Sequence, residues 1–191
     1  MNHPDTNTAI ATVLARYISR GHEAYHGEPV SQLEHALQAA ELAQKGHPDD
    51  PDFILAAFLH DYGHLCDADT GDMDGYGVRE HERIGAEALA SLGFDEKVTR
   101  LVAGHVLAKR YLVSTDPAYR AALSQASAIT LEKQGGFLSA AEQQAFEQDS
   151  LFELHIALRR LDEQAKEEAL SRETDWNWLE QLLRAHLDAR T

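Results

Sequence analysis

The chain has 191 residues and a formal net charge of −15, with 32 acidic residues against 17 basic ones. This length fits a single domain, and so strong a negative charge excludes nucleic acid and anionic membranes as expected partners. No stretch approaches the roughly 20 apolar residues of a membrane span, and the N-terminus has no secretory-signal pattern. Cys66 is the only cysteine, which rules out an intramolecular disulfide, so we expect a cytoplasmic protein.

The hydrophobic periodicity is helical over nearly the whole chain. The predicted helices cover residues 8–21, 31–46, 51–64, 78–92, 95–109, 117–133, 149–171 and 176–187, with one more starting at 139. Capping boxes (Ser31 with Glu34, Ser139 with Glu142) and Asp116 before Pro117 mark three of the starts. With no strand or repeat in the pattern, the expected fold is one all-α domain, residues 1–191, of roughly seven to nine helices.

Several histidines and aspartates fall on or beside the apolar faces of different predicted helices. They are His35, His60, His81, His105 and Asp162, and Asp61 follows His60 directly in FLHDYGHL. A polar group that faces a core is costly unless it is paired, and a shared metal ion would pair them all. Imidazole with carboxylate favours iron, zinc or manganese over calcium. A lone histidine on an apolar face is more often a hydrogen-bonded core residue, and we prefer that interpretation for His155 and His186.

The order H…HD…H…H…D resembles the dinuclear members of the HD-domain superfamily, all-α metalloproteins of which most are phosphohydrolases. The resemblance implies a helical bundle with a buried dinuclear metal site. In that site Asp61 would bridge two ions. One ion would be held by His35, His60 and Asp162, and the other by His81 and His105.

The similarity extends to residues beyond the ligands, over about residues 20–165. The segments YHGEPVSQLEHALQ, AAFLHDYGHLC, DGYGVREHERIGA, GHVLAKRYLVS and RRLDE resemble the PhnZ/TmpB-like mixed-valent diiron oxygenases, which cleave the C–P bond of organophosphonates. The resemblance implies an Fe(II)/Fe(III) pair, O2 as co-substrate and a small hydroxyphosphonate substrate. That substrate would be 1-hydroxy-2-(trimethyl)ammonioethylphosphonate, giving phosphate and glycine betaine, or 2-amino-1-hydroxyethylphosphonate, giving phosphate and glycine.

Three basic side chains lie one helical turn from predicted ligands. They are His64, Lys109 and Arg159, one turn from His60, His105 and Asp162 respectively. On shared helix faces they could bind a phosphonate through charge-assisted hydrogen bonds. The alternatives are a solvated surface lysine and an arginine paired with a nearby surface glutamate. The resemblance favours phosphonate binding by Lys109 and Arg159 and adds Ser127.

The other end of the substrate is expected to meet the segment 25–28. By resemblance, Glu28 pairs with the ammonium, and Tyr25 occupies an open iron position until substrate arrives. Tyr62 stands where the oxygenases have leucine, and we interpret it as a contact for a bulkier methylated cation. The alternative for this segment is an ordinary surface loop.

The main alternative function is an HD-domain metal-dependent phosphohydrolase that acts on a phosphoester or nucleotide and needs no O2. Some dinuclear HD phosphodiesterases share all six ligands, so the ligand set alone leaves both functions open. The combination of Tyr25, Glu28, Lys109 and Arg159 favours the oxygenase. An intact ligand set argues against a third alternative, a nucleotide sensor with a decayed site. The sequence leaves open the degree of N-methylation, the metal loaded in the cell and the oligomeric state.

Overall fold

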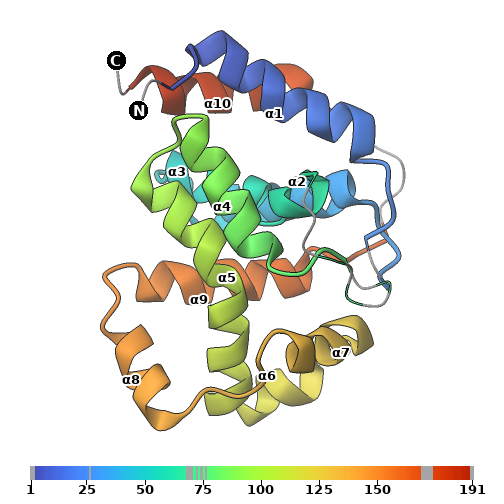
Figure 1. Ribbon diagram of the computed structural model, residues 1–191, viewed down its shortest axis with the longest axis vertical. Coiled ribbons are helices and arrows are strands. Elements are labelled where there is room, and N and C mark those ends of the chain that lie inside the picture. The colour runs from blue at the N-terminus through green and yellow to red at the C-terminus, as the bar shows by residue number, and fades with distance from the viewer. Residues whose placement is uncertain are drawn as a thin grey trace.

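The structure is a computed structural model that describes residues 3–25, 27–67, 71, 73, 75, 77–168 and 174–189. The all-α class is confirmed, since the described residues form ten α-helices and one 3-10 helix, and their only β pairing is an isolated bridge between Ala24 and Ser31 (Figure 1). In chain order the elements are α1 (Thr6–Arg20), α2 (Gln32–Gly46), α3 (Pro51–Leu59), η1 (Tyr62–Leu65), α4 (His81–Ser91), α5 (Glu96–Thr115), α6 (Pro117–Ala122), α7 (Gln125–Lys133), α8 (Ala140–Glu147), α9 (Phe152–Gln164) and α10 (Trp176–Asp188).

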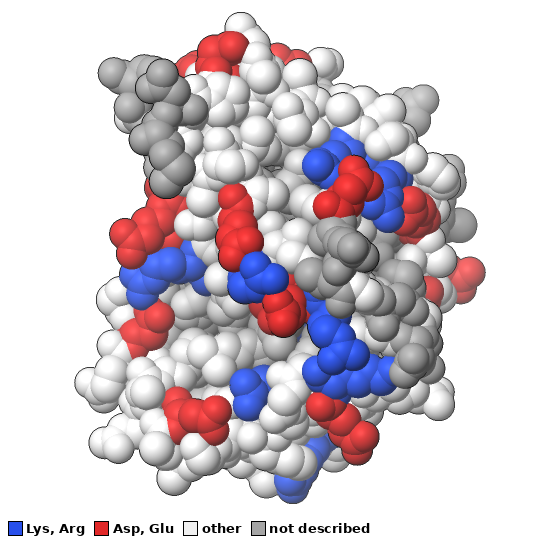
Figure 2. Space-filling model, in the orientation of Figure 1, with Lys and Arg blue, Asp and Glu red and all other residues white. Residues whose placement is uncertain are grey.

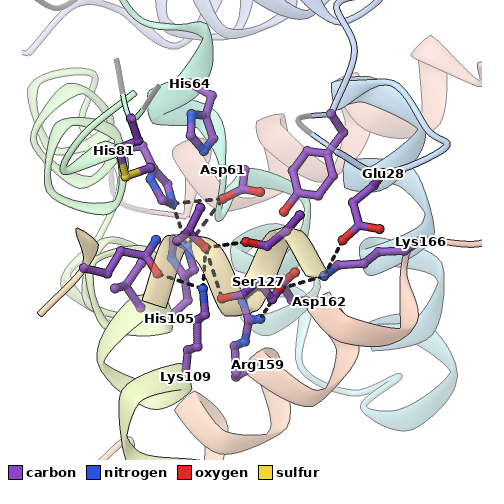
Figure 3. Close-up of a pocket in the computed structure, with 16 residues that line it drawn as sticks. Glu28, Asp61, His64, His81, His105, Lys109, Ser127, Arg159, Asp162 and Lys166 are labelled. Atoms are coloured by element: carbon purple, nitrogen blue, oxygen red, sulfur yellow. Dashed lines mark hydrogen bonds and ion pairs between the residues drawn. The ribbon is translucent and has the colours of Figure 1, made fainter. Parts of the chain in front are cut away.

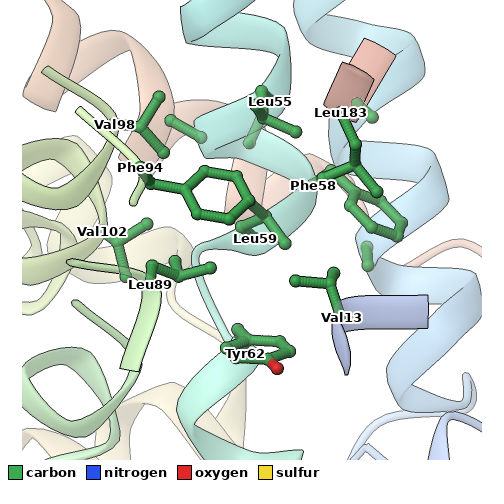
Figure 4. Close-up of a cluster of buried hydrophobic side chains, with 14 of the residues drawn as sticks. Val13, Leu55, Phe58, Leu59, Tyr62, Leu89, Phe94, Val98, Val102 and Leu183 are labelled. Atoms are coloured by element: carbon green, nitrogen blue, oxygen red, sulfur yellow. The ribbon is translucent and has the colours of Figure 1, made fainter. Parts of the chain in front are cut away.

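Helix α3 lies at the centre of the main core, and its residues 53–59 are all buried. A helix that is apolar on every side is stable only in the interior. It packs against α2, α5, α9 and α10. Figure 4 shows Leu55 and Phe58 of this helix among Val98 of α5 and Leu183 of α10.

Helix α3 ends at Leu59, so the helix predicted over 51–64 is wrong at its C-terminal end. His60 is the C-cap, and Asp61 lies between α3 and the 3-10 helix η1. The carbonyls released by the break find other donors: Phe58 O accepts the Tyr17 hydroxyl, and Ala57 O pairs with His60 Nδ1, both at 2.8 Å. Because these groups are satisfied, the helix can stop at the His-Asp pair without leaving buried acceptors unpaired.

Three other predicted helices also differ from the structure. The helix predicted over 117–133 is two helices, because Ser124 caps α7 by accepting the Ser127 N–H at 3.1 Å. The helix predicted over 149–171 begins at Phe152 and ends at Gln164, and its predicted last residues, 169–171, lie outside the described residues. Helix α4 begins at His81, three residues after the predicted start.

The predicted capping signals are confirmed. Ser31 accepts the Glu34 N–H at 3.2 Å while Glu34 accepts the Ser31 N–H at 2.7 Å, and Ser139 and Glu142 make the same reciprocal pair. Each box satisfies backbone donors that the first helical turn cannot.

Helix α5 extends beyond the main core, and α6, α7 and α8 gather around its C-terminal half (Figure 1). A second, smaller hydrophobic cluster forms there, comprising Leu112, Val113, Tyr119 and Leu131. Acidic and basic side chains lie next to one another across the face shown in Figure 2. None of the described helices combines the length and the apolar character that a membrane crossing requires.

Gly63 allows η1 to pack directly on the start of α4. A Cβ atom at this position would lie 1.9 Å from the His81 carbonyl oxygen and 2.9 Å from the Gly85 nitrogen. Both neighbours are backbone atoms, which cannot move aside as a flexible side chain can. Only glycine therefore fits between the His-Asp pair and the helix that carries His81.

We predict that Gly63→Ala lowers the free energy of unfolding by about 1–3 kcal/mol or more, because the added methyl group forces the two backbones apart. The same displacement moves His81 and lowers the metal content. Denaturant unfolding measures the first effect and elemental analysis the second. Gly46→Ala is the control, since a Cβ there has no atom within 4 Å. Equal stability of the two variants would contradict the prediction.

Candidate functional site

The carboxylate of Asp61 lies between two pairs of histidines. Its Oδ2 is 3.5 Å from His35 Nε2 and 3.3 Å from His60 Nε2. Its Oδ1 is 3.3 Å from His81 Nε2 and 3.4 Å from His105 Nε2. Each oxygen of one side chain thus faces its own pair of imidazoles, the arrangement that a bridging carboxylate requires.

Within each pair the two ring nitrogens are close together. His35 Nε2 and His60 Nε2 are 3.0 Å apart, and so are His81 Nε2 and His105 Nε2. Two ligands at right angles around one ion, with bonds of about 2.1 Å, lie about 3.0 Å from each other. Each pair therefore has the spacing of adjacent ligands on one metal ion.

The opposite nitrogen of each ring sets the tautomer. The four Nδ1 atoms lie against backbone carbonyls: His35 at 2.8 Å from Ala165 O, His60 at 2.8 Å from Ala57 O, His81 at 3.3 Å from Val78 O and His105 at 2.7 Å from Val102 O. A carbonyl accepts only, so Nδ1 of each ring carries a proton and Nε2 is the nitrogen that faces the centre and can bind a metal ion.

Asp162 completes the first pair. Its Oδ1 is 3.5 Å from His35 Nε2, and its Oδ2 accepts a hydrogen bond from Arg159. Asp61 Oδ2 and Asp162 Oδ1 are buried and have no hydrogen-bond partner. Buried carboxylate oxygens without donors are costly unless a cation is present. The donor set therefore fits two metal ions joined by Asp61, and imidazole with carboxylate suits iron, zinc or manganese.

Charge in the centre is also consistent with cation binding. Burial raises the pKa of both carboxylates. The charge of His60 lowers the pKa of Asp61 by more than burial raises it, and the charge of Arg159 does the same for Asp162, so both pKa values lie below their ordinary range. Burial lowers the pKa of His60, but Asp61 raises it to about 9. A metal ion that binds His60 therefore displaces a proton.

The structure brings together all six predicted ligands, which come from five separate regions of the chain. His35 lies on α2, His60 and Asp61 at the junction of α3 and η1, His81 on α4, His105 on α5 and Asp162 on α9, all of them buried.

A small cavity adjoins this centre. The space open to the centres of water-sized spheres is about 50 Å³. Six of the other predicted site residues line it: Tyr25, Glu28, His64, Lys109, Ser127 and Arg159. Asp61, His81, His105 and Asp162 form part of the same wall, so the cavity reaches the candidate metal centre (Figure 3).

Lys109 is not a surface lysine, because only 2% of it is exposed. Its Nζ donates to Thr130 Oγ1 at 2.7 Å and to Gln134 Oε1 at 2.8 Å. Burial, followed by the charge of Arg159, lowers the pKa of Lys109 to about 6. An anion in the cavity would favour its charged form.

Arg159 is also buried, so it is not a surface residue, although it does pair with a nearby glutamate as the alternative expected. It donates to Asp162 and pairs with Glu163, while its Nε donates to Tyr119 Oη at 2.8 Å and its Nη2 to Ser127 Oγ at 3.3 Å. With its donors used in this way, Arg159 holds Asp162 and Ser127 in position and contributes positive charge to the cavity.

His64 differs from the metal-facing histidines in its proton position. The Val78 N–H donates to His64 Nδ1 at 3.1 Å, so the neutral ring carries its proton on Nε2. The ring stacks on His81 with centroids 3.9 Å apart. His64 is therefore suited to donate a hydrogen bond rather than to bind a metal ion.

Tyr25 stacks on the ring of His35, with centroids 4.0 Å apart. Burial, followed by the charges of Asp61 and Asp162, raises the pKa of Tyr25 well above its ordinary value. The phenol therefore remains protonated at neutral pH, beside the bridging carboxylate.

The expectation that Tyr62 contacts the substrate is corrected by the structure. Tyr62 is 0% exposed and belongs to the main hydrophobic core (Figure 4), and it is not among the residues that line the cavity. Its ring lies 6.1 Å from that of Tyr17, with the Arg16 guanidinium 5.9 Å away. It follows Asp61 by one residue and packs among core residues.

Comparison with known proteins agrees with this geometry. The HD domain family matches residues 32–135, more than half of the chain. The chain belongs to the HD-domain family. It is 38% identical over 186 residues to the 1-hydroxy-2-(trimethylamino)ethylphosphonate dioxygenase (glycine-betaine-forming) of Leisingera caerulea, a match that covers 93% of each chain.

Two further relatives of this HD-domain chain cover most of its length. The hydroxymethylphosphonate dioxygenase of Gimesia maris is 42% identical over 151 residues, which cover 78% of this chain and 74% of that protein. Protein L432 of Acanthamoeba polyphaga mimivirus is 42% identical over 159 residues, 82% of this chain and 72% of that one.

Several residues that line the cavity were not predicted from the sequence. Thr130 and Gln134 lie three and seven residues after Ser127, so the helical period could have identified them. Lys166 also lines the cavity, but it follows the C-cap residue Ala165 of α9, where helical spacing no longer applies.

His155 and His186 both lie outside the centre, but only His186 is the hydrogen-bonded core residue expected from the sequence, because His155 Nδ1 is buried without a hydrogen-bond partner among the described residues. His186 donates from Nδ1 to Asp52 Oδ1 at 2.8 Å and accepts the Asp95 N–H on Nε2 at 3.3 Å, so both of its nitrogens are used. His155 packs against Gly104, where an added Cβ would meet its ring at 2.3 Å.

We predict that Asp61→Asn lowers bound metal from about two ions per chain to fewer than one, because both sites share this carboxylate. His81→Ala removes a ligand of one site only and should leave about one ion. Elemental analysis after anaerobic loading measures both values. The exposed His22→Ala is the control. Equal metal loss in the Asp61 and His81 variants would contradict a shared carboxylate.

We predict a pH-dependent stability difference between the wild type and Lys109→Met, both measured with chelator. Between pH about 6 and 10.5 the unfolded chain binds a proton on Lys109 that the folded chain does not. The wild type therefore gains stability relative to the variant as the pH rises through this window, by at most about 1.4 kcal/mol per pH unit. Denaturant unfolding across the window measures the difference. A difference that is independent of pH would show that Lys109 has an ordinary pKa.

Proposed function

We propose that this chain is a diiron dioxygenase that cleaves the C–P bond of a 1-hydroxyphosphonate, with O2 as co-substrate. The observation that carries the proposal is the wall shared by the candidate dinuclear centre and the cavity, since Asp61, His81 and His105 line the same cavity as Lys109 and Arg159. Two relatives that match most of the chain are named as dioxygenases of such phosphonates.

The proposed centre holds two iron ions in a mixed-valent Fe(II)/Fe(III) state, one on His35, His60 and Asp162 and the other on His81 and His105, with Asp61 between them. Once bound, these ions would supply the redox chemistry that O2 activation needs. The chain itself contributes a fixed donor set, since each histidine is oriented by a backbone carbonyl.

The proposed role of the cavity is to bind and orient the phosphonate. Lys109 and the Nε2–H of His64 would donate to its oxygens, with added charge from Arg159 and a hydroxyl from Ser127. The binding of a dianion would draw a proton onto Lys109, whose pKa is about 6 without it. Tyr25 would cover the His35 side of the centre, beside Asp61. Holding the carbon that reacts in one place is the main advantage that such a cavity gives.

In the proposed reaction the C–P bond, the C–H bond of the same carbon and the O–O bond break, and one C–O bond and one P–O bond form. One oxygen atom of O2 ends in the carboxylate and the other in phosphate, and one proton is released. The substrates expected from the sequence give glycine betaine from the trimethylammonio compound and glycine from the amino compound. Hydroxymethylphosphonate, named for the Gimesia maris relative, is a third candidate substrate.

We predict O2-dependent phosphate release from at least one of these three compounds by protein loaded anaerobically with Fe(II). Phosphate and O2 consumption, measured together, should appear in a ratio of about one to one, as the balanced reaction requires. Lys109→Met should lower kcat/KM by at least about tenfold, the loss expected for one charged contact to the phosphonate.

Two outcomes would contradict the proposal. One is an absence of phosphate release from all three compounds. The other is hydrolysis of phosphoesters with Mn(II) and without O2, which would identify the chain as a metal-dependent phosphohydrolase instead.

A further inference from the structure

Glu28 has a special position among the carboxylates of the cavity. The described lining residues include three acidic side chains, Glu28, Asp61 and Asp162. Asp61 and Asp162 belong to the candidate metal centre. An ammonium group on a substrate would therefore have Glu28 as its only available carboxylate among the described lining residues.

Glu28 already has a cationic partner from the chain itself. Lys166 Nζ lies 3.2 Å from Glu28 Oε1, and each of the two side chains is 10% exposed. Glu28 Oε1 is a buried oxygen without a well-aligned hydrogen bond, so this ion pair is what balances its charge. Figure 3 shows the two side chains meeting at the edge of the cavity.

Three further oxygens hold Lys166 at this place. Its Nζ lies 3.0 Å from Ser127 Oγ, 3.1 Å from Glu163 Oε2 and 3.4 Å from Ser124 Oγ. If a substrate ammonium paired with Glu28, these three oxygens would still hold Lys166 next to it. Lys166 would keep the Glu163 carboxylate as a partner. A substrate ammonium at Glu28 would then lie beside the Lys166 ammonium in a poorly solvated site, and the two cations would repel each other.

We propose that Lys166 is a specificity-determining residue that neutralises Glu28 and makes the cavity prefer a hydroxyphosphonate without an ammonium group. The smallest such substrate is hydroxymethylphosphonate. This inference rests on the proposed function, and it orders the three candidate substrates.

The reaction balances for this substrate. Hydroxymethylphosphonate dianion and O2 give formate, hydrogen phosphate dianion and one proton. The C–P bond and a C–H bond break, one oxygen atom bonds to carbon and the other to phosphorus, and the four electrons removed from the substrate reduce O2.

The test compares kcat/KM for phosphate release from hydroxymethylphosphonate, (R)-2-amino-1-hydroxyethylphosphonate and its N-trimethyl analogue, using the Fe(II)-loaded full chain. We expect the wild type to prefer hydroxymethylphosphonate by at least about tenfold. Lys166→Met leaves Glu28 unpaired and should shift this ratio by at least about tenfold toward the ammonium compounds. Lys166→Arg keeps the charge and should keep the preference. Adding Glu28→Gln to Lys166→Met should abolish the shift.

Controls separate specificity from folding and from the proposed function itself. Lys45→Met, at an exposed position of α2, should match the wild type. Because the readout is a ratio between substrates, a general loss of active protein does not change it. A wild type that prefers an ammonium compound, or a ratio unchanged in Lys166→Met, would overturn the inference while leaving the proposed function intact. Phosphate release from none of the three compounds would overturn the proposed function as well.

Discussion

The Asp61 carboxylate faces four imidazole nitrogens, each 3.3 to 3.5 Å from one of its oxygens. Those nitrogens all face the centre, because the far side of each ring donates to a backbone carbonyl. An ionised carboxylate and the lone pairs of neutral imidazoles cannot satisfy one another without cations, which are either metal ions or protons such as the one on His60. Several features of the surrounding structure serve this centre. Helix α3 ends at Leu59, just before His60 and Asp61, and the Tyr17 hydroxyl donates to the Phe58 carbonyl that this helix end leaves without a helical partner. Gly63 lets helix α4, which carries His81, pack close to η1.

Four of the candidate metal ligands, His35, His81, His105 and Asp162, could be predicted from helical periodicity, whereas Asp61 came from its place after His60 and from the resemblance. A buried histidine on an amphipathic helix faces the same interior as the leucines around it, so polar groups on several apolar faces converge without any knowledge of the loops. The capping boxes at Ser31 and Ser139 could be predicted for a similar reason, since they depend on residues three apart within one turn.

The parts that could not be predicted depend on where periodicity stops. The break after Leu59 needs the Tyr17 hydroxyl, which comes from a helix distant in sequence. The expected substrate contact of Tyr62 was inferred from the resemblance. Helical spacing argues against it, because a residue two positions from both His60 and His64 lies on the opposite side of a helical turn from both. Lys166 follows the end of α9, so its place beside Glu28 depends on tertiary contacts that no local pattern contains.

The separation of the ligands along the chain has a thermodynamic consequence. The first and last of them, His35 and Asp162, are brought within 3.5 Å of each other only by the folded bundle. The unfolded chain offers no comparable site, so metal binding and folding are linked equilibria. Each bound ion then adds about 1.4 kcal/mol to the stability of the native state for every tenfold rise in free metal above its dissociation constant. The concentration of available metal in its surroundings thus sets the free energy of unfolding of the chain as well as whether its centre is complete.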